Sequence, residues 1–394
     1  MKSIFTASIA CIVAFALCNS YSLSPYILTF LQQLPLTNLR PSQQTSEPLS
    51  SNTTTTFLGF PFALTALFAP SKPANMPVPR AIRQVFLAKE QSEGVGARVR
   101  RSIGSPKLRN FSPFLLLDHF TSSPGAGFPD HPHRGQETIT YILHGAIDHE
   151  DFAGNSGTIE AGDLQFMTAG RGIMHSEMPR QSADGSPMVG MQLWVDLPEK
   201  LKTCEPRYRD LRAKEIPQIE VSDGKASIKI ISGQSHGTDS VKELAYTPVW
   251  IFDITIKPGG KVTQELPEGW NAFAYTLAGK LSFGSKDTQT VDPYHVVVFE
   301  QKGEAVTVGV NASAAEDSRF CKLPTYAPPQ TSHIADNATI VLFAGLPLDQ
   351  KVVQHGPFVL NSEEQAYQAM LDFQSHSNGF ERAAGWRSKI GRNR

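Results

Sequence analysis

The sequence predicts an all-β protein of two similar barrels followed by one C-terminal helix. From about residue 85 to residue 347, short apolar runs rich in Val, Ile, Phe and Thr are broken by turn residues, as strands and hairpins require. The 30 glycines and 28 prolines also favour many turns over a helical bundle. Residues 141–170 and 275–303 share a pattern of strand, glycine turn, strand, polar loop and strand, which indicates two barrels of one kind.

The barrel pattern divides the chain into segments. Residues 201–225 are charged and lack strand character, so we expect a linker there. Residues 321–340 are rich in proline and other turn residues, and we expect a loop inserted into the second barrel. The expected segments are an N-terminal extension (1–75), a first barrel holding the metal site (76–200), a linker (201–225), a second barrel without metal (226–360), and a helix with a tail (361–394).

The expected helix lies after the second barrel. Asn361 or Ser362 suits the N-cap, because its side-chain oxygen can accept a hydrogen bond from a free backbone N–H group. Glu363 and Glu364 fall in the first turn, where the helix dipole favours negative charge. The apolar residues that recur on one face are Ala366, Met370 and Phe373.

The N-terminal extension leaves two interpretations open. Residues 1–20 carry one lysine, then an apolar run and small residues, a pattern typical of a secretory signal and too short for a membrane span. A targeting role would send the protein to a secretory or organellar compartment. Met76, however, opens a stretch that already resembles domain sequence. Translation from Met76 would place the protein in the cytoplasm, the nucleus or both.

Charge and cysteine content exclude several classes of protein. Lys and Arg number 36 against 37 Asp and Glu, so no global field attracts nucleic acid or anionic lipid, and we expect no direct nucleic-acid binding. We expect a monomer. The cysteines show no close pairing of a zinc, redox or disulfide-scaffold kind. They are Cys11, Cys18, Cys204 and Cys321.

The stretch "DHPHRGQET" concentrates metal-binding side chains at the start of an expected strand. His131 and His133 are two residues apart, so an extended chain directs both imidazoles to one face. Pro132 between them restricts the backbone and preorganises the pair. One such pair alone is more often a surface or hydrogen-bonded feature than a metal site.

A second pair changes that balance. "GRGIMHSEMP" places His175 and Glu177 two residues apart, again before a proline. Two pairs on separate strands can direct four ligands to one point inside a barrel. Three imidazoles and one carboxylate suit Fe(II), Mn(II), Co(II), Ni(II) or Cu(II) better than Ca(II) or Mg(II). An octahedral ion would keep two positions open.

The neighbouring residues leave other roles open. Glu137 could be a ligand or a partner for Arg134. We expect an outer or exposed position, rather than ligation, for Asp130, His144 and His149. Four apolar residues are candidates for the walls of a pocket above the metal, although an ordinary core position is the more common outcome for each. They are Phe128, Phe166, Met167 and Met174.

From about residue 85 onward, the chain resembles the pirin family of the cupin superfamily. The resemblance rests on long blocks: "FPDHPHRGQETITYILHG", "HEDFAGNSGTIEAGDLQFMTAGRGIMHSEMP", "MQLWVDLP", "QHGPFVL" and "NGFERAAGWRSKIG". It implies two cupin barrels packed face to face, with iron, Fe(2+), in the first barrel only. The ligands that the resemblance implies are His131, His133, His175 and Glu177; Glu137 is not among them.

The resemblance implies two alternative functions. One is a quercetin 2,3-dioxygenase activity, in which a flavonol is cleaved with O₂ and Glu177 is both ligand and general base. The other is a non-enzymatic, redox-dependent co-regulator that contacts transcription-factor proteins. The near-neutral charge fits contact with proteins rather than DNA. Fold class does not choose between them.

Overall fold

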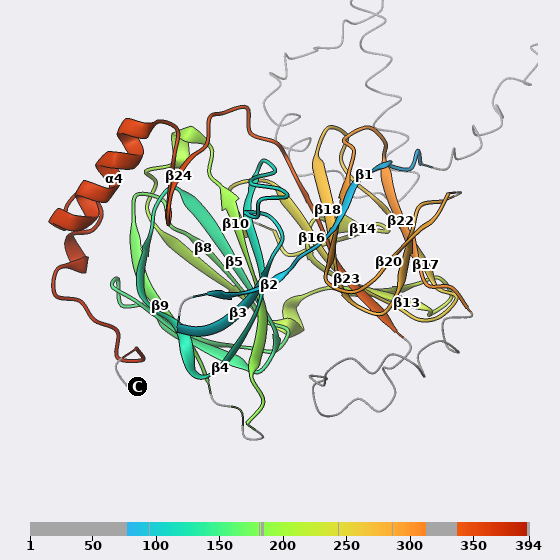
Figure 1. The fold of residues 1–394 in the computed structure, drawn as a ribbon, viewed down its shortest axis with the longest axis horizontal. Coiled ribbons are helices and arrows are strands. Elements are labelled where there is room, and N and C mark those ends of the chain that lie inside the picture. The colour runs from blue at the N-terminus through green and yellow to red at the C-terminus, as the bar shows by residue number, and fades with distance from the viewer. Residues whose placement is uncertain are drawn as a thin grey trace, which may run out of the picture. The chain divides into compact units, whose positions relative to one another are not determined.

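The computed structural model describes residues 77–93, 95–180, 182, 185–242, 244–285, 287–312 and 337–391. The expected extension over residues 1–75, with Cys11 and Cys18, therefore lies outside the described residues. The same holds for Cys321 and for most of the expected insertion. The expected all-β fold of two barrels with a C-terminal helix is confirmed (Figure 1).

The first barrel is one curved sheet in which the long strand β4 bends from one layer into the other. The first half of β4 pairs with β3 and β10, and its second half pairs with β9. Its strands are β2 (Glu90–Glu93), β3 (Val95–Arg101), β4 (Phe114–His133), β5 (Gln136–His144), β6 (Ala146–Asp151), β7 (Ser156–Glu160), β8 (Leu164–Thr168), β9 (Ile173–Pro179), β10 (Met188–Asp196) and β11 (Arg207–Leu211).

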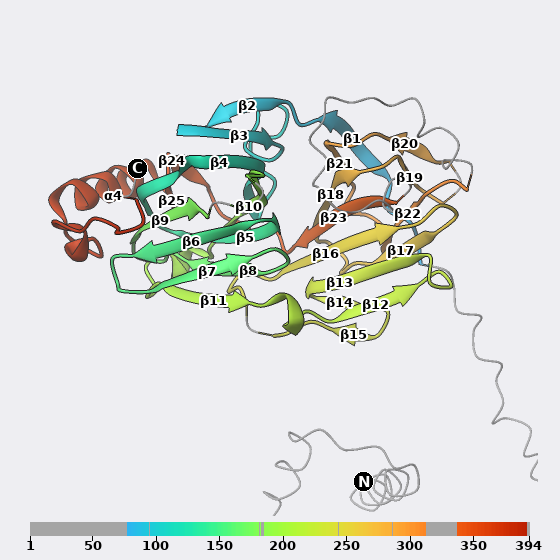
Figure 2. The ribbon, with the colours of Figure 1, turned by 90° about the horizontal axis from the view of Figure 1, so that it is seen from below.

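The second barrel consists of a seven-stranded and a four-stranded sheet, and the hairpin β14–β15 forms a separate two-stranded sheet beside them. The first described strand, β1, pairs with β21 of this barrel, although it precedes the first barrel in sequence (Figure 2). The strands are β1 (Ile82–Leu87), β12 (Gln218–Val221), β13 (Ala226–Ser232), β14 (Gln234–Ser235), β15 (Thr238–Asp239), β16 (Val249–Ile256), β17 (Lys261–Glu265), β18 (Asn271–Ala278), β19 (Leu281–Phe283), β20 (Gln289–Val291), β21 (His295–Phe299), β22 (Ala305–Gly309) and β23 (Ala338–Gly345).

The two barrels pack through one shared apolar core. Phe114 of the first barrel packs edge-on against Phe273 of the second, with ring centroids 5.1 Å apart. The seven-stranded sheet contributes one face to this interface and the other to the apolar interior of its own barrel. Burial on both faces explains near-continuous apolar strands such as β21. A buried hydrogen bond of 2.6 Å from the Tyr141 hydroxyl to Asp253 also joins the barrels.

Two expectations for connecting segments are wrong. The stretch 201–225, expected to lack strands, contains β11, which pairs with β8, and β12, which pairs with β13. Arg209 of β11 and Glu220 of β12 are exposed on these edge strands, and such charged residues obscure the apolar pattern of a strand in the sequence. The loop expected over 321–340 extends too far, because residues 338–340 begin the buried strand β23.

The chain ends on the first barrel. The hairpin of β24 (Val353–His355) and β25 (Phe358–Leu360) is followed by helix α4 (Glu363–Ser375), which lies beside the first barrel in Figures 1 and 2. Ser362 is the N-cap and forms a capping box with Gln365. The expected apolar face packs on the barrel through Ala366, Met370 and Phe373. Among the described residues, no helix has the length and apolar character to cross a bilayer.

Candidate metal centre

The two ligand pairs lie side by side on antiparallel strands of the first barrel. His131 and His133 belong to the second half of β4, and His175 and Glu177 belong to β9. His131 lies directly opposite His175 in the register. Because alternate residues share one face of a strand, the side chains of both pairs point the same way.

The three imidazoles form a tight cluster. Their nitrogen atoms available for ligation all lie within 4.8 Å of one another. The ring centroids of His131 and His175 are 4.3 Å apart, and Oε2 of Glu177 lies 3.9 Å from Nε2 of His175. The structure therefore brings the four residues together, while their assignment as ligands stays a prediction.

The hydrogen bonds around the imidazoles fit a metal ion. Nδ1 of His131 lies 2.8 Å from the carbonyl oxygen of Pro129, so an Nδ1–H donor there would leave Nε2 free for a metal. Both ring nitrogens of His175 are buried and have no hydrogen-bond partner among the described residues. Burial lowers the pKa of all three histidines, which keeps them neutral as ligation requires.

Gln136 supports the same conclusion for His133. Its side-chain nitrogen lies 2.9 Å from Nδ1 of His133, and its side-chain oxygen is buried without a partner. With the amide rotated by 180°, its oxygen would accept a hydrogen bond from Nδ1–H of His133. Nε2 of His133 would then be free to bind a metal ion.

Glu177 is buried beside the histidines. Oε1 accepts a hydrogen bond of 3.2 Å from Thr140, and Oε2 lies 3.4 Å from the amide nitrogen of Gln192. Burial raises the pKa of Glu177 to about 7, against the effect of these two hydrogen bonds. A bound cation would act in the opposite direction and favour the carboxylate form.

A cavity of about 390 Å³ opens onto this cluster. Of the four expected apolar walls, only Phe128 lines it. Phe166 belongs to the core between the barrels, Met167 to a small cluster near β9, and Met174 to the core beneath the C-terminal segment. The complete lining is Glu93, Arg101, Leu116, Asp118, Phe120, Phe128, His131, His133, Glu177, Gln192, Trp194, Gln354, Gly356 and Pro357.

Several lining residues are absent from the sequence-based expectations. Gln192 and Trp194 alternate on β10 with residues of the interface core, and the Trp194 ring lies edge-on to His133 with centroids 5.2 Å apart. The alternation within "MQLWVDLP" is a signal that could have placed them inside the barrel. Gln354 comes from the distant hairpin β24–β25, which no local pattern could reveal.

The remaining candidates have structural roles. Glu137 accepts hydrogen bonds from Thr168 and from the backbone N–H groups of residues 246 and 247, so it joins the barrels and does not pair with Arg134. Of the three expected outer residues, Asp130 accepts hydrogen bonds from a backbone N–H group, His144 contacts a serine hydroxyl, and the buried His149 contacts the Gln165 amide.

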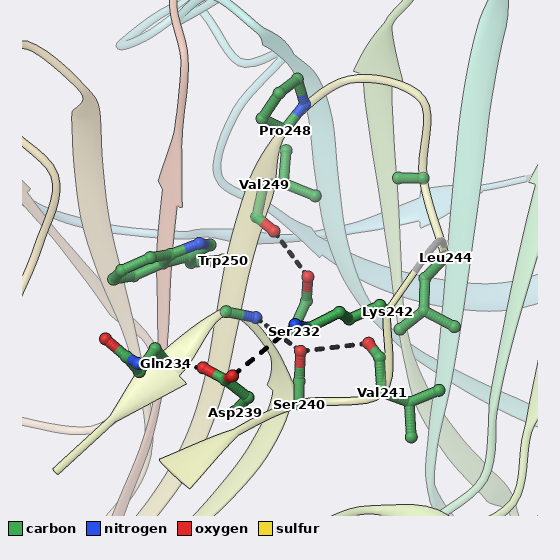
Figure 3. A pocket seen from close by; sticks show the side chains of 12 residues that line it. Ser232, Gln234, Asp239, Ser240, Val241, Lys242, Leu244, Pro248, Val249 and Trp250 are labelled. Atoms are coloured by element: carbon green, nitrogen blue, oxygen red, sulfur yellow. Dashed lines mark hydrogen bonds and ion pairs between the residues drawn. The ribbon is translucent and has the colours of Figure 1, made fainter. Parts of the chain in front are cut away.

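A second pocket of about 360 Å³ lies on the other barrel, between the β14–β15 hairpin and β16 (Figure 3). Trp250 and Gln234 lie on one side, and Lys242 is 3.8 Å from Asp239. Because it contains none of the clustered histidines, the cavity of the first barrel is the stronger candidate for chemistry.

Comparisons with known proteins match both barrels. The family model described as Pirin covers residues 96–195, and the one described as Pirin C-terminal cupin domain covers residues 251–321 and 328–379. Pirin of Homo sapiens is 46% identical over 307 residues, which cover 77% of this chain and 96% of that protein. A pirin-like protein of Solanum lycopersicum is 46% identical over 311 residues, which cover 79% of this chain and 97% of that protein.

A solved structure agrees with this relationship. Quercetin 2,3-dioxygenase from Acinetobacter baumannii aligns with a TM-score of 0.65 and 25% identity, over 76% of this chain and 98% of that chain. Both family models match this chain, and the two relatives at 46% identity align over nearly their full length. The chain therefore belongs to the pirin family.

Proposed function

We propose that the protein is an iron-dependent dioxygenase of the quercetin 2,3-dioxygenase type, which cleaves flavonols with O₂. The observation that carries this proposal is the cluster of three neutral imidazoles and Glu177 at a cavity that is lined in part by aromatic and other apolar side chains. The likeness to the Acinetobacter baumannii quercetin 2,3-dioxygenase supports it.

The donor set fits Fe(2+), and other divalent transition metals would fit the same set. His131, His133, His175 and Glu177 would hold the ion, which would act as a Lewis acid toward a flavonol oxygen and support reaction with O₂. The protein's own side chains supply the ligands and the proton acceptor. Its neutral imidazoles need no proton loss before they bind the metal.

Glu177 is the group placed to accept the proton of the flavonol hydroxyl. It lines the cavity beside the histidines, and Thr140 and Gln192 orient its carboxylate. Phe128 and Trp194 offer aromatic surface to the flavonol rings.

O₂ uptake tests this function. Protein loaded anaerobically with Fe(2+) should consume O₂ when quercetin is added, and Glu177→Gln should lose at least ~100-fold in rate, the usual scale of a general base. Metal content is measured in parallel, so that loss of iron is separated from loss of the proton acceptor. Glu160→Gln, at an exposed residue of β7, is the matched control. Iron-loaded wild-type protein without quercetin-dependent O₂ uptake would contradict the proposal.

A second candidate is a non-enzymatic co-regulator that contacts transcription-factor proteins in a redox-dependent way. One contact favours it: Arg134, next to His133, is paired with Asp372 of α4. The same helix exposes Tyr367 and Leu371. Hydrogen exchange of α4 that differs between ferrous and ferric protein would support this function, and identical exchange would contradict it.

A further inference from the structure

A charged group shares the cavity with the histidines. Glu93, Arg101 and Asp118 all line it. Nε and Nη2 of Arg101 donate hydrogen bonds of 2.9 and 2.7 Å to the two carboxylate oxygens of Asp118, and Nη2 also lies 3.1 Å from Oε2 of Glu93. One guanidinium therefore serves two carboxylates.

This group leaves one negative charge uncompensated. The described residues that line the cavity include no Lys and no Arg other than Arg101. The Asp118 side chain is only 9% exposed and is fully engaged by the guanidinium, whereas that of Glu93 is 38% exposed. The excess negative charge therefore lies on the Glu93 side of the group.

The group is fixed relative to the histidine cluster by the sheet. Arg101 on β3 lies opposite Asp118 on β4, and Asp118 lies opposite Gln192 on β10. The amide of Gln192 in turn reaches Glu177, at 3.4 Å. A ligand held at the histidines therefore lies in a cavity whose floor continues along adjacent strands to the carboxylates.

We propose that Glu93, with Arg101 and Asp118, selects cavity ligands by charge, accepting neutral hydroxylated ring systems and rejecting ligands with an added anionic group. This inference rests on the proposed function, from which the flavonol class of ligand is taken. Ring hydroxyls donate hydrogen bonds that carboxylate oxygens accept, whereas a fixed sulfonate or carboxylate is repelled by the uncompensated charge. Glu93 is thus a specificity-determining residue.

Binding calorimetry of the Fe(2+)-loaded protein, without O₂, tests this proposal. The ligands are quercetin and a quercetin sulfonate with one fixed negative charge. Wild-type protein should bind quercetin about tenfold more tightly, and Glu93→Gln should reduce that ratio about threefold, because a partly exposed charge is screened by solvent. The ratio should also fall as salt concentration rises.

Glu90→Gln is the matched control, since Glu90 lies on the same strand, pairs with Arg98 and Arg100, and does not line the cavity. It should leave the ratio as in wild type. An unchanged ratio in Glu93→Gln, or equal binding or no binding of both ligands by wild-type protein, would overturn the charge selection. Quercetin bound with the expected preference but without O₂ uptake would contradict the dioxygenase function alone.

Discussion

Nη1 of Arg134 lies 2.7 Å from Oδ2 of Asp372, so the residue next to His133 is paired with the C-terminal helix α4. Both side chains are buried. The Arg134 guanidinium also donates to the backbone oxygen of Arg171, before β9, and lies over the ring of Phe380. One side chain thus connects both histidine-bearing strands to the end of the chain.

Loss of the Asp372 charge should destabilise the protein strongly. Asp372→Asn would leave the Arg134 charge buried without its partner, and we expect the free energy of unfolding to fall by about 3 kcal/mol. Urea denaturation followed by circular dichroism measures this change. Glu363, on the same helix, forms an exposed pair with His355 of β24, and Glu363→Gln should cost less than about 1 kcal/mol. Equal costs for the two variants would show that the buried pair has no special weight.

Local spacing is the reason that the histidine cluster could be predicted. His131 and His133, and likewise His175 and Glu177, are two residues apart, and any extended strand places such a pair on one face. The cluster then needs only that the two strands be neighbours, which the barrel supplies. The N-cap of α4 was predictable for the same reason, because capping depends on adjacent residues.

Contacts between distant segments could not be predicted in this way. Arg134 and Asp372 are 238 residues apart, and nothing near Arg134 indicates its partner, for which Glu137 was one candidate. The pairing of β1 with β21 depends on a register across the whole chain. The prediction of the pocket walls was wrong for three of four residues for a similar reason. An apolar residue on a strand can line a core or a cavity, and the sequence does not show which until the neighbouring strands are known.

Glu137→Gln should destabilise the protein without loss of metal. The Glu137 carboxylate accepts hydrogen bonds from Thr168, Tyr246 and Thr247 at the junction of the barrels. Charge-assisted hydrogen bonds contribute more than neutral ones, so we expect a loss of about 2 kcal/mol in the free energy of unfolding. Denaturant titration and elemental analysis measure the two properties. Metal loss from Glu137→Gln would instead assign Glu137 to the metal site.

His119 should make stability depend on pH. It is enclosed beside Tyr275, and burial together with the positive charge of Arg100 lowers its pKa from 6.5 to about 4. Between about pH 6.5 and pH 4, His119 is protonated in the unfolded chain but stays neutral in the folded protein. The free energy of unfolding is therefore unaffected by His119 above pH 6.5 and decreases as the pH falls toward 4. The loss is at most about 1.4 kcal/mol per pH unit. His119→Gln should show a shallower fall over this range in denaturant titrations, and parallel curves would contradict the assignment.

Gln136 should strengthen metal binding although it does not touch the metal. With its oxygen toward His133, it would hold the imidazole in the tautomer that presents Nε2 to the ion, and such outer partners contribute about 10- to 100-fold in affinity. Gln136→Leu should therefore weaken metal affinity by about tenfold, as measured by competition with a chelator. Gln165 makes a contact of the same length, 2.9 Å, with His149, which lies outside the cluster. Gln165→Leu removes an equivalent buried amide and should leave metal affinity unchanged. Equal losses in the two variants would mean that the effect comes from general destabilisation of the barrel rather than from orientation of His133.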